Sequence, residues 1–288
     1  MAQSQRIRVQ LKELGEPAVE YVRRVAGDYV LPIVCDYTPL GSGTLVQIDR
    51  WQGILSAEHV MRHPTRDDLR LTYTGHPDRF LRTAVGPFAH DLSITTNALR
   101  IIATDRESNP YGPDLAFVLL PPSPFLGELT ARKSFYNLTL KTEERKAAAL
   151  SDAGFFALCG FPAVRDFTAP AELGFSETRG LYGYSMLTGP EHYERKDHWD
   201  YYEMGVSQNS ADEFQRTFGG VSGGAVWRAV PYRRAHDSPG AEYIGAMTLA
   251  GVAFYEMDDR SKPRFYVRAH GPLSIYDTLI DLVRAALS

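Results

Sequence analysis

The chain has few cysteines, no long apolar run and no excess of positive charge. Cysteine occupies 2 of its 288 positions, so at most one disulfide can form, and we expect Cys35 and Cys159 to be buried, unreactive thiols. The apolar runs are well short of the ~20 residues that span a bilayer, and the N-terminal segment contains no apolar signal sequence. These absences predict a cytoplasmic protein with no membrane partner.

The charge balance excludes a further class of partner. Lysine and arginine total 31 against 35 aspartates and glutamates, for a net charge of −4. Proteins that bind nucleic acid through its phosphates carry a basic surface, so we predict no nucleic-acid partner. With 44% hydrophobic and 23% charged residues, 24 Gly and 18 Pro, the composition is typical of a folded, turn-rich globular protein rather than a disordered one.

Short β-rich runs separated by Gly, Pro and Asp dominate the chain from Tyr29 onward. Such runs are typical of antiparallel strands. A helix is expected before them, over residues 17–26, because Pro17 suits the first helical position and Gly27 follows the last turn. A second helix is expected at the end of the chain, where Ser274 is a candidate N-cap followed by an apolar stripe at helical spacing.

The strand-rich runs fall into two groups. Between them, residues 121–150 begin with PPSP and end in the charged stretch LKTEERKAAA, a composition typical of a connector. We therefore divide the chain into an N-terminal arm (1–28), a first β-domain (29–120), this connector and a second β-domain that includes the C-terminal helix (151–288). Strands of this length at short intervals indicate barrels or sandwiches rather than βαβ units.

A serine surrounded by glycines is the most informative segment of the sequence. Ser222 lies in the run FGGVSGGAVW, which is followed at once by β-forming residues. Because glycine adopts backbone conformations closed to other residues, this turn can expose the hydroxyl and leave the N–H groups of Gly220 and Ser222 free to converge on one point. Such a turn suits a nucleophile beside an oxyanion hole. An ordinary glycine-rich hairpin explains the segment equally well.

Two further residues could activate a serine hydroxyl, which is a poor nucleophile without a base. His59 comes at the end of the predicted strand that contains ILS, and Asp114 directly precedes the apolar run LAFVLL. A carboxylate in that position can orient an imidazole and stabilise its protonated form. Taken alone, His59 is more simply a surface or structural histidine, and Asp114 more simply closes a Gly-Pro turn.

Together, four segments resemble the chymotrypsin/trypsin-like serine proteases over about residues 29–288. They are GSGTLV at 41–46, LSAEH at 55–59, DLA at 114–116 and GVSGG at 220–224, and they occur in the order of that family. The resemblance implies an all-β fold of two antiparallel six-stranded β-barrels with the active site between them.

The same resemblance implies the chemistry of the site. Ser222 would be the nucleophile, His59 the general base and Asp114 the residue that orients it, with the N–H groups of Gly220 and Ser222 as the oxyanion hole. A protein or peptide would be the substrate. Neither a cofactor nor a metal would be needed.

The sequence departs from the secreted members of the family beside the catalytic residues. Val221 precedes the serine where zymogen-activated relatives carry an aspartate, so activation by a cut N-terminus is not expected. The sequence more closely resembles the intracellular and bacterial trypsin-like peptidases, and this resemblance leads us to expect restricted substrate choice or control by a regulatory protein partner. Glu58 stands beside His59 where the family has a small residue, and we expect its side chain to face solvent.

Substrate contacts are also implied by the resemblance. Arg216, six residues before Ser222, would lie at the floor of the specificity pocket and favour an acidic residue in the substrate. Ala253, Phe254 and Tyr255 would contact the substrate and form a wall of the pocket. Tyr255 replaces a glycine of wide-pocket members and would narrow the entrance.

Two other hypotheses compete with a protease. The chain could be a binding module that keeps the protease fold and recognises a peptide without cleaving it. The segment EHYERKDHWD at 191–200 could be a metal site, but its histidines match no zinc-ligand spacing, and a charged surface loop is the simpler interpretation.

Overall fold

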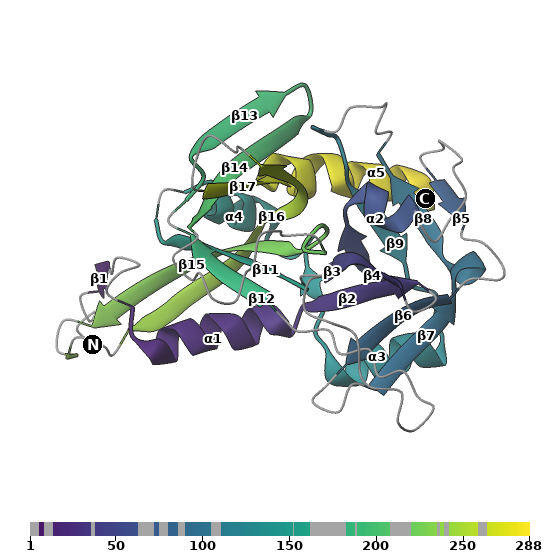
Figure 1. Cartoon of the computed structure of the whole chain (residues 1–288), viewed down its shortest axis with the longest axis horizontal. Coiled ribbons are helices and arrows are strands. Elements are labelled where there is room, and N and C mark those ends of the chain that lie inside the picture. Colours follow the sequence, from purple (N-terminus) through teal and green to yellow (C-terminus); the bar gives the residue numbers. More distant parts are fainter. Residues whose placement is uncertain are drawn as a thin grey trace.

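A computed structural model describes residues 6–8, 14–35, 38–62, 72–74, 80–85, 90–104, 111–151, 153–161, 183–187, 189–207, 220–234, 237–238, 242–258 and 264–288. The fold is mainly β, as the sequence predicted, and its strands form two sheets (Figure 1). Arg216, the predicted floor of the specificity pocket, lies outside the described residues.

The first sheet contains the strands between residues 30 and 119 and one short strand from the connector. They are β2 (Val30–Cys35), β3 (Thr38–Ile48), β4 (Trp51–Ser56), β5 (Thr72–Thr74), β6 (Phe80–Val85), β7 (His90–Thr95), β8 (Arg100–Ala103), β9 (Ala116–Leu119) and β10 (Tyr136–Asn137). Their order is β5-β8-β9-β4-β3-β2-β6-β7, and β10 pairs with β3 in parallel. The other pairings in this sheet are antiparallel.

The second sheet contains all described strands after residue 155 and one from the N-terminal arm. They are β1 (Arg6–Arg8), β11 (Phe155–Gly160), β12 (Gly183–Leu187), β13 (His192–Lys196), β14 (Trp199–Ser207), β15 (Ala225–Arg234), β16 (Tyr243–Asp258) and β17 (Arg264–His270). Their order is β12-β11-β15-β16-β17-β14-β13, and β1 pairs with β15. In the described part of the chain these eight-stranded and nine-stranded sheets do not close, so closed six-stranded barrels are not confirmed.

Helices cover the sheets and fill the connector. They are α1 (Glu16–Gly27), α2 (Glu58–Arg62), the 3₁₀ turn η2 (Thr96–Ala98), α3 (Pro124–Arg132), α4 (Thr142–Leu150), the π-helical segment η3 (Ser274–Leu279) and α5 (Ile280–Leu287). The connector is therefore folded, with a helix on either side of β10. Its first helix begins where the Ser123 hydroxyl accepts a hydrogen bond from the N–H of Leu126 at 3.3 Å.

The N-terminal helix forms close to where the sequence predicts it. Pro17 lies in its first turn, and the buried residues Ala18, Val22 and Ala26 recur every four positions along one face. That face packs on β15 and β16 of the second sheet, and Figure 1 shows α1 lying along the outside of these strands.

The prediction that Ser274 caps the C-terminal helix is wrong. The Asp200 carboxylate instead accepts hydrogen bonds from the N–H groups of Leu273 and Ser274, at 3.1 and 2.7 Å. The Ser274 hydroxyl donates to the backbone carbonyl of Asp200 at 3.0 Å. A carboxylate from a distant strand therefore supplies the cap that a local serine was expected to provide.

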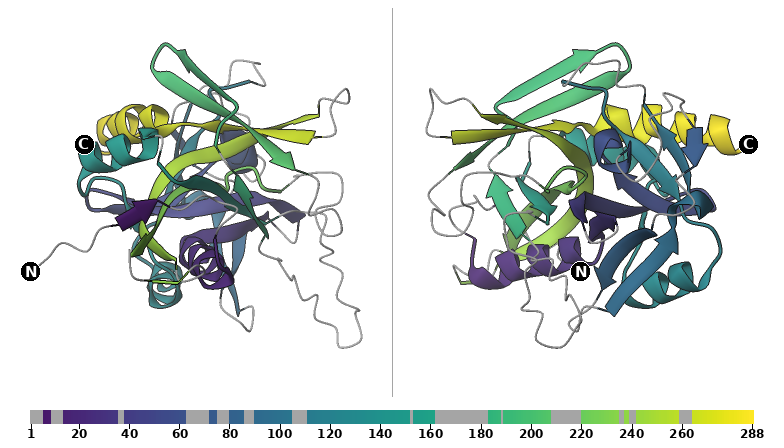
Figure 2. Two further views of the ribbon diagram at one scale, coloured as in Figure 1. Left: turned by 90° about the vertical axis from the view of Figure 1, so that its left-hand side faces the viewer. Right: turned by 45° about the vertical axis from the view of Figure 1, so that its right-hand side comes forward.

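The C-terminal helix connects the two sheets. Figure 2 shows it extending from the second sheet toward the first. Its start, η3, packs on β14, and α5 packs on β8. Near its end, Arg284 donates to both carboxylate oxygens of Asp49 in the β3–β4 turn, at 2.9 and 3.0 Å.

The hydrophobic core is shared between the sheets. One buried cluster joins Phe117 of the first sheet to Trp227 and Phe155 of the second, and another joins the first sheet to Tyr201 and Phe254. Both predicted thiols, Cys35 and Cys159, are buried and form no disulfide. Within the described residues, the helices are all too short or too polar to cross a bilayer.

Candidate active site

The pairing of β4 with β9 places His59 beside Asp114. Ser56, the last residue of β4, pairs with Ala116, the first residue of β9. The chain then turns into the short helix α2, which carries His59, while Asp114 lies two residues before the start of β9. The sequence located His59 at the end of a strand, whereas the structure places it in the first turn of the helix that follows.

The Asp114 carboxylate binds His59 through both of its oxygens. One accepts a hydrogen bond from the backbone N–H of His59 at 2.9 Å, and the other lies 2.7 Å from Nδ1 of its imidazole. The Asp114 side chain is fully buried, while that of His59 is 34% exposed. An ionised carboxylate accepts hydrogen bonds only, so Nδ1 carries the proton and Nε2 of the neutral ring is free to accept one.

The Ser222 turn is held in shape by its glycines. Gly220 and Gly223 have φ angles of +91° and +84°, in the left-handed region that glycine adopts without strain. The N–H of Gly224 donates to the carbonyl of Val221 and the N–H of Gly223 to that of Ala253, both at 2.7 Å. The backbone around Ser222 is therefore fixed locally and against strand β16.

Ser42 of β3 joins this turn to the first sheet. Its N–H donates to the carbonyl of Ser222 at 2.8 Å, and its hydroxyl donates to the carbonyl of Gly220 at 2.7 Å. The Ser56 hydroxyl in turn donates to the Ser42 carbonyl at 2.8 Å. Ser222 is thereby attached to the end of β4, directly before the helix that carries His59.

Steric contacts confirm how closely the serine and histidine segments approach. A Cβ atom added at Gly41 would lie 2.8 Å from the Ser222 carbonyl oxygen and 2.8 Å from a methyl of Val60, the residue after His59. One added at Gly223 would lie 2.0 Å from the Ser42 carbonyl oxygen. Glycine is therefore required at both positions for the two sheets to meet here.

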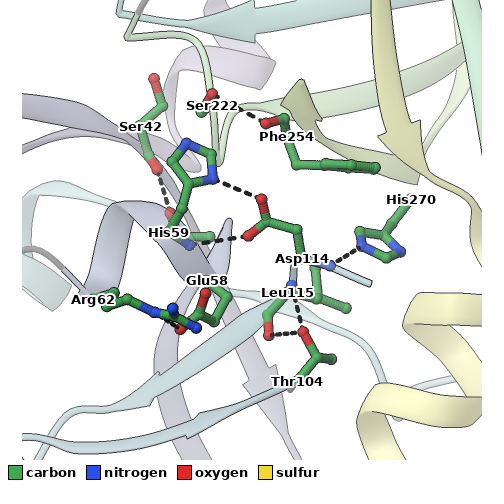
Figure 3. Close-up of polar contacts among 11 residues, drawn as sticks. Ser42, Glu58, His59, Arg62, Thr104, Asp114, Leu115, Ser222, Phe254 and His270 are labelled. Atoms are coloured by element: carbon green, nitrogen blue, oxygen red, sulfur yellow. Dashed lines mark hydrogen bonds and ion pairs between the residues drawn. The ribbon is translucent and has the colours of Figure 1, made fainter. Parts of the chain in front are cut away.

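The structure brings the three predicted residues into one site, but without a bond between Ser222 and His59. In Figure 3 the His59 ring lies between Ser222 on one side and Asp114 on the other. The Ser222 hydroxyl donates to the carbonyl of Phe254 at 3.4 Å and not to His59. Unliganded active sites often have such loose geometry, which tightens when substrate binds.

The N–H groups predicted for the oxyanion hole are available. Within the described residues, neither the N–H of Gly220 nor that of Ser222 donates a hydrogen bond. The Val221 carbonyl accepts from Gly224, and since the peptide unit is planar, the N–H of Ser222 points away from that bond. Both groups can therefore donate to an oxygen outside the turn.

A second histidine, which the sequence analysis missed, contacts Asp114 from the other sheet. His270, the last residue of β17, accepts a hydrogen bond at Nε2 from the backbone N–H of Asp114 at 3.0 Å (Figure 3). Its ring packs on Phe254 and Tyr201, with ring centroids 4.7 and 5.1 Å away. Burial lowers the pKa of His270 to about 3, although the nearby Asp114 favours the charged form. A lone histidine in a β-rich run carries no signal that could have identified it.

The expectation that Glu58 faces solvent is wrong. Glu58 is 3% exposed, and its carboxylate accepts a hydrogen bond from Arg62 at 2.8 Å. The two residues lie one helical turn apart, a spacing at which opposite charges attract. The Arg62 cation offsets part of the cost of burying this carboxylate.

The predicted substrate-contacting strand is already engaged with the serine turn. Ala253 donates its N–H to Gly224 and accepts from Gly223. Phe254 is 1% exposed, whereas Tyr255 is half-buried and packs edge-to-face on Tyr111, at 5.6 Å between ring centroids. Of the three predicted contacts, Tyr255 thus has the side chain most accessible to a substrate.

A cavity of about 400 Å³ lies elsewhere, on the second sheet. Phe156, Tyr202 and Arg228 line it, and none of the predicted site residues does. The Arg228 guanidinium donates to the carbonyl of Ala149 in the last turn of α4 and to that of Ala153 just after the helix, so it stabilises the C-terminal end of α4.

The segment considered as a metal site forms the β13–β14 hairpin. Its histidines, His192 and His198, are exposed. Among the described residues, no group of three or more His, Cys, Asp and Glu side chains could hold a metal ion. The charged surface loop predicted for this segment is thus a two-stranded hairpin.

Comparison with protein-family models finds none that matches the chain. Comparison with curated proteins finds no match either. The function is therefore proposed from the residues and from the geometry in which they meet.

Proposed function

We propose that this protein is a serine endopeptidase that cleaves peptide bonds through Ser222, His59 and Asp114. The observation that carries the proposal is the bond between His59 and a fully buried Asp114, at 2.7 Å, with the opposite edge of the imidazole toward the Ser222 turn (Figure 3). A structural histidine would need neither this orientation nor a partly exposed ring beside a glycine-lined serine.

The reaction follows from the donors and acceptors of the three side chains. The Ser222 oxygen attacks the carbonyl carbon of the peptide bond while its proton passes to Nε2 of His59. The C–N bond then breaks, the amine leaves with that proton, and an ester to Ser222 remains. Water hydrolyses the ester by the same steps, with His59 first accepting and then returning the proton. Asp114 stays ionised and stabilises the imidazolium.

The oxyanion that forms during each attack would be bound by two backbone donors. The N–H groups of Gly220 and Ser222 donate no hydrogen bond within the described residues and suit this role, since preformed donors stabilise developing charge without reorganisation. The loss of one such donor typically costs 10²–10³-fold in rate in serine proteases.

The proposal includes the fold and setting that the resemblance implies. The two sheets would correspond to two six-stranded barrels, with the active site in the groove between them. The substrate would be a protein or peptide, chosen narrowly or under the control of a regulatory protein partner. A cytoplasmic location is part of the proposal, and it is supported by two buried cysteines that form no disulfide.

A fluorophosphonate probe tests the proposal directly. The purified protein should be phosphonylated at Ser222, and it should cleave bonds in a peptide library. Ser222→Ala should lose both activities, with a fall in kcat of several orders of magnitude. Ser238→Ala, which removes an exposed serine, is the matched control and should keep both. Labelling of other serines alone, or equal cleavage by Ser222→Ala, would contradict the proposal.

One observation favours a second candidate, a peptide-binding module. The Ser222 hydroxyl is bonded to the Phe254 carbonyl instead of His59, as it would be in a protein that keeps the fold without the activity. In that case the wild-type protein would bind peptides from the library, for example in an equilibrium pull-down, while remaining unlabelled by the probe and leaving every peptide intact.

A further inference from the structure

Strand β17 contacts the segment that carries Asp114 at two points. His270 accepts from the N–H of Asp114, and Arg268 donates through Nε to the carbonyl of Tyr111 at 3.1 Å. His270 and Arg268 are two residues apart and so lie on the same face of the strand. The second sheet thus holds the 111–114 segment, although Asp114 acts on a histidine of the first sheet.

We propose that His270 is a positioning residue of the active site: its neutral imidazole fixes the backbone of Asp114 and thereby aims the carboxylate at His59. This inference rests on the proposed function. Both hydrogen bonds from His59 to Asp114 depend on the direction in which that side chain leaves the backbone.

The chemistry of the acceptor supports the proposal. The N–H of Asp114 is buried and needs an acceptor. A carboxylate in that place would add a second negative charge beside Asp114, which disfavours the ionised form that His59 needs. A neutral imidazole accepts the bond without adding charge.

In the described part of the chain, the bond from Asp114 is the one hydrogen bond that the His270 ring makes. The ring is fully buried, and within the described residues its Nδ1 has no hydrogen-bond partner. Nε2 accepts from Asp114, so the proton of the neutral ring lies on Nδ1, among the rings of Trp199, Tyr201 and Phe254. A purely apolar side chain would fill the same space without burying an unpaired N–H.

Long-range ¹H–¹⁵N spectra of the wild-type imidazoles test the assignment without any need for activity. We expect His270 to be neutral, protonated at Nδ1 and unchanged as the pH is varied around neutrality, and His59 to be protonated at Nδ1. A His270 ring that is protonated at Nε2, or that titrates near neutrality, would overturn the proposal. If the fluorophosphonate probe never labels the wild-type protein, the proposed function is refuted. The imidazole spectra can still be recorded and interpreted in that case, because they do not depend on activity.

Variants then separate positioning from packing. His270→Phe keeps a ring but removes the acceptor, and we expect kcat to fall by about 10²-fold, the cost of displacing a catalytic group by about 1 Å, with KM unchanged. His270→Gln restores an acceptor and should recover most of kcat and the wild-type His59 spectrum. Val267→Ala, on the opposite face of β17, is the control for lost packing and should leave kcat nearly unchanged.

The same variants can also overturn the proposal. If His270→Phe folds and keeps the wild-type kcat and His59 spectrum, His270 only packs. If His270→Phe fails to fold, His270→Gln decides: a folded Gln variant with the wild-type His59 spectrum supports the proposal, and one whose His59 has lost its Nδ1 proton overturns it.

Discussion

At the scale of the residue, two imidazoles beside one aspartate have opposite roles because their surroundings differ. His59 is partly exposed and donates to the Asp114 carboxylate, whereas His270 is fully buried and accepts from the Asp114 backbone. Solvent reaches the first ring, whereas burial lowers the pKa of the second and keeps that ring neutral. The sequence pointed to His59 through its segment LSAEH, but nothing in the chain around His270 indicated its role.

Asp114→Asn should impair catalysis without removing the fold. The carboxylate gives two acceptors to two donors of His59, its backbone N–H and its Nδ1–H, but an amide has one oxygen. The imidazole is then driven to carry its proton on Nε2, where it cannot accept from Ser222. We expect kcat to fall roughly 10⁴-fold, the loss that this substitution causes in a Ser-His-Asp triad. A peptide-cleavage assay measures this, and an equal rate in the variant would show that Asp114 does not orient the base.

The buried His270 should make stability depend on pH. Its pKa falls from an ordinary 6.5 to about 3 in the folded protein, so between these values the unfolded chain binds a proton that the folded chain excludes. The resulting stability is complete above pH 6.5 and is lost as the pH falls toward 3. Chemical denaturation should show His270→Gln losing stability more slowly than the wild type in this range, by up to about 1.4 kcal/mol per pH unit. If the free energy of unfolding of the two proteins fell equally with pH over this range, the prediction would be wrong.

At the scale of the element, residue periodicity predicted those helices and strands whose formation depends little on the segments packed against them. The helix over 17–26 and most β-rich runs were predicted because their periodicity is visible in the chain. The β13–β14 hairpin was missed because its outer strand is charged and exposed, with the turn at Asp197, which has a φ of +55°. The helix α2 was missed because it is only five residues long.

In the candidate site, too, some features could be predicted from local sequence and others depend on the packing of distant segments. The order of the His, Asp and Ser segments was visible in the sequence. The buried environment of Glu58, the contact of His270 with Asp114 and the link through Ser42 arise only when distant strands pack. No local property of those residues indicates such contacts.

The cap on the C-terminal helix gives a prediction at this scale. Asp200→Ala removes the carboxylate that accepts from the N–H groups of Leu273 and Ser274. The buried N–H of Ser274 and the partly buried N–H of Leu273 lose this acceptor, which should lower the free energy of unfolding by about 1–3 kcal/mol. Urea denaturation provides the measurement. Asp281→Ala, at an exposed position of α5, is the control and should change stability by no more than about 0.5 kcal/mol.

At the scale of the whole molecule, the site exists only because the two sheets meet. Ser42 lies at this meeting point: its hydroxyl donates to Gly220 and accepts from the N–H of Phe161 at 2.8 Å. A second link, between Asp49 and Arg284, joins the C-terminal helix to the first sheet. The first link is buried and the second is half-exposed, so they should differ in energy.

Ser42→Ala should therefore cost more than Asp49→Asn. Loss of the Ser42 hydroxyl removes its hydrogen bonds with the Gly220 carbonyl and the Phe161 N–H, at the point where the two sheets meet, and we expect stability to fall by about 1–3 kcal/mol, with slower labelling of Ser222. Asp49→Asn removes a solvent-screened ion pair and should cost less than about 1 kcal/mol. Denaturation curves for both variants measure these losses of stability. A larger loss in Asp49→Asn than in Ser42→Ala would mean that the C-terminal helix, rather than Ser42, joins the sheets.

The bond from the Ser222 hydroxyl to the Phe254 carbonyl has a kinetic consequence. To reach His59 the hydroxyl must rotate about a single bond, Cα–Cβ, and side chains turn in this way within picoseconds to nanoseconds. The backbone on either side is already anchored by hydrogen bonds. The proposed endopeptidase would therefore rest with the Ser222 hydroxyl turned away from His59 and still react with each arriving substrate without delay, so product should accumulate from the first milliseconds with no lag.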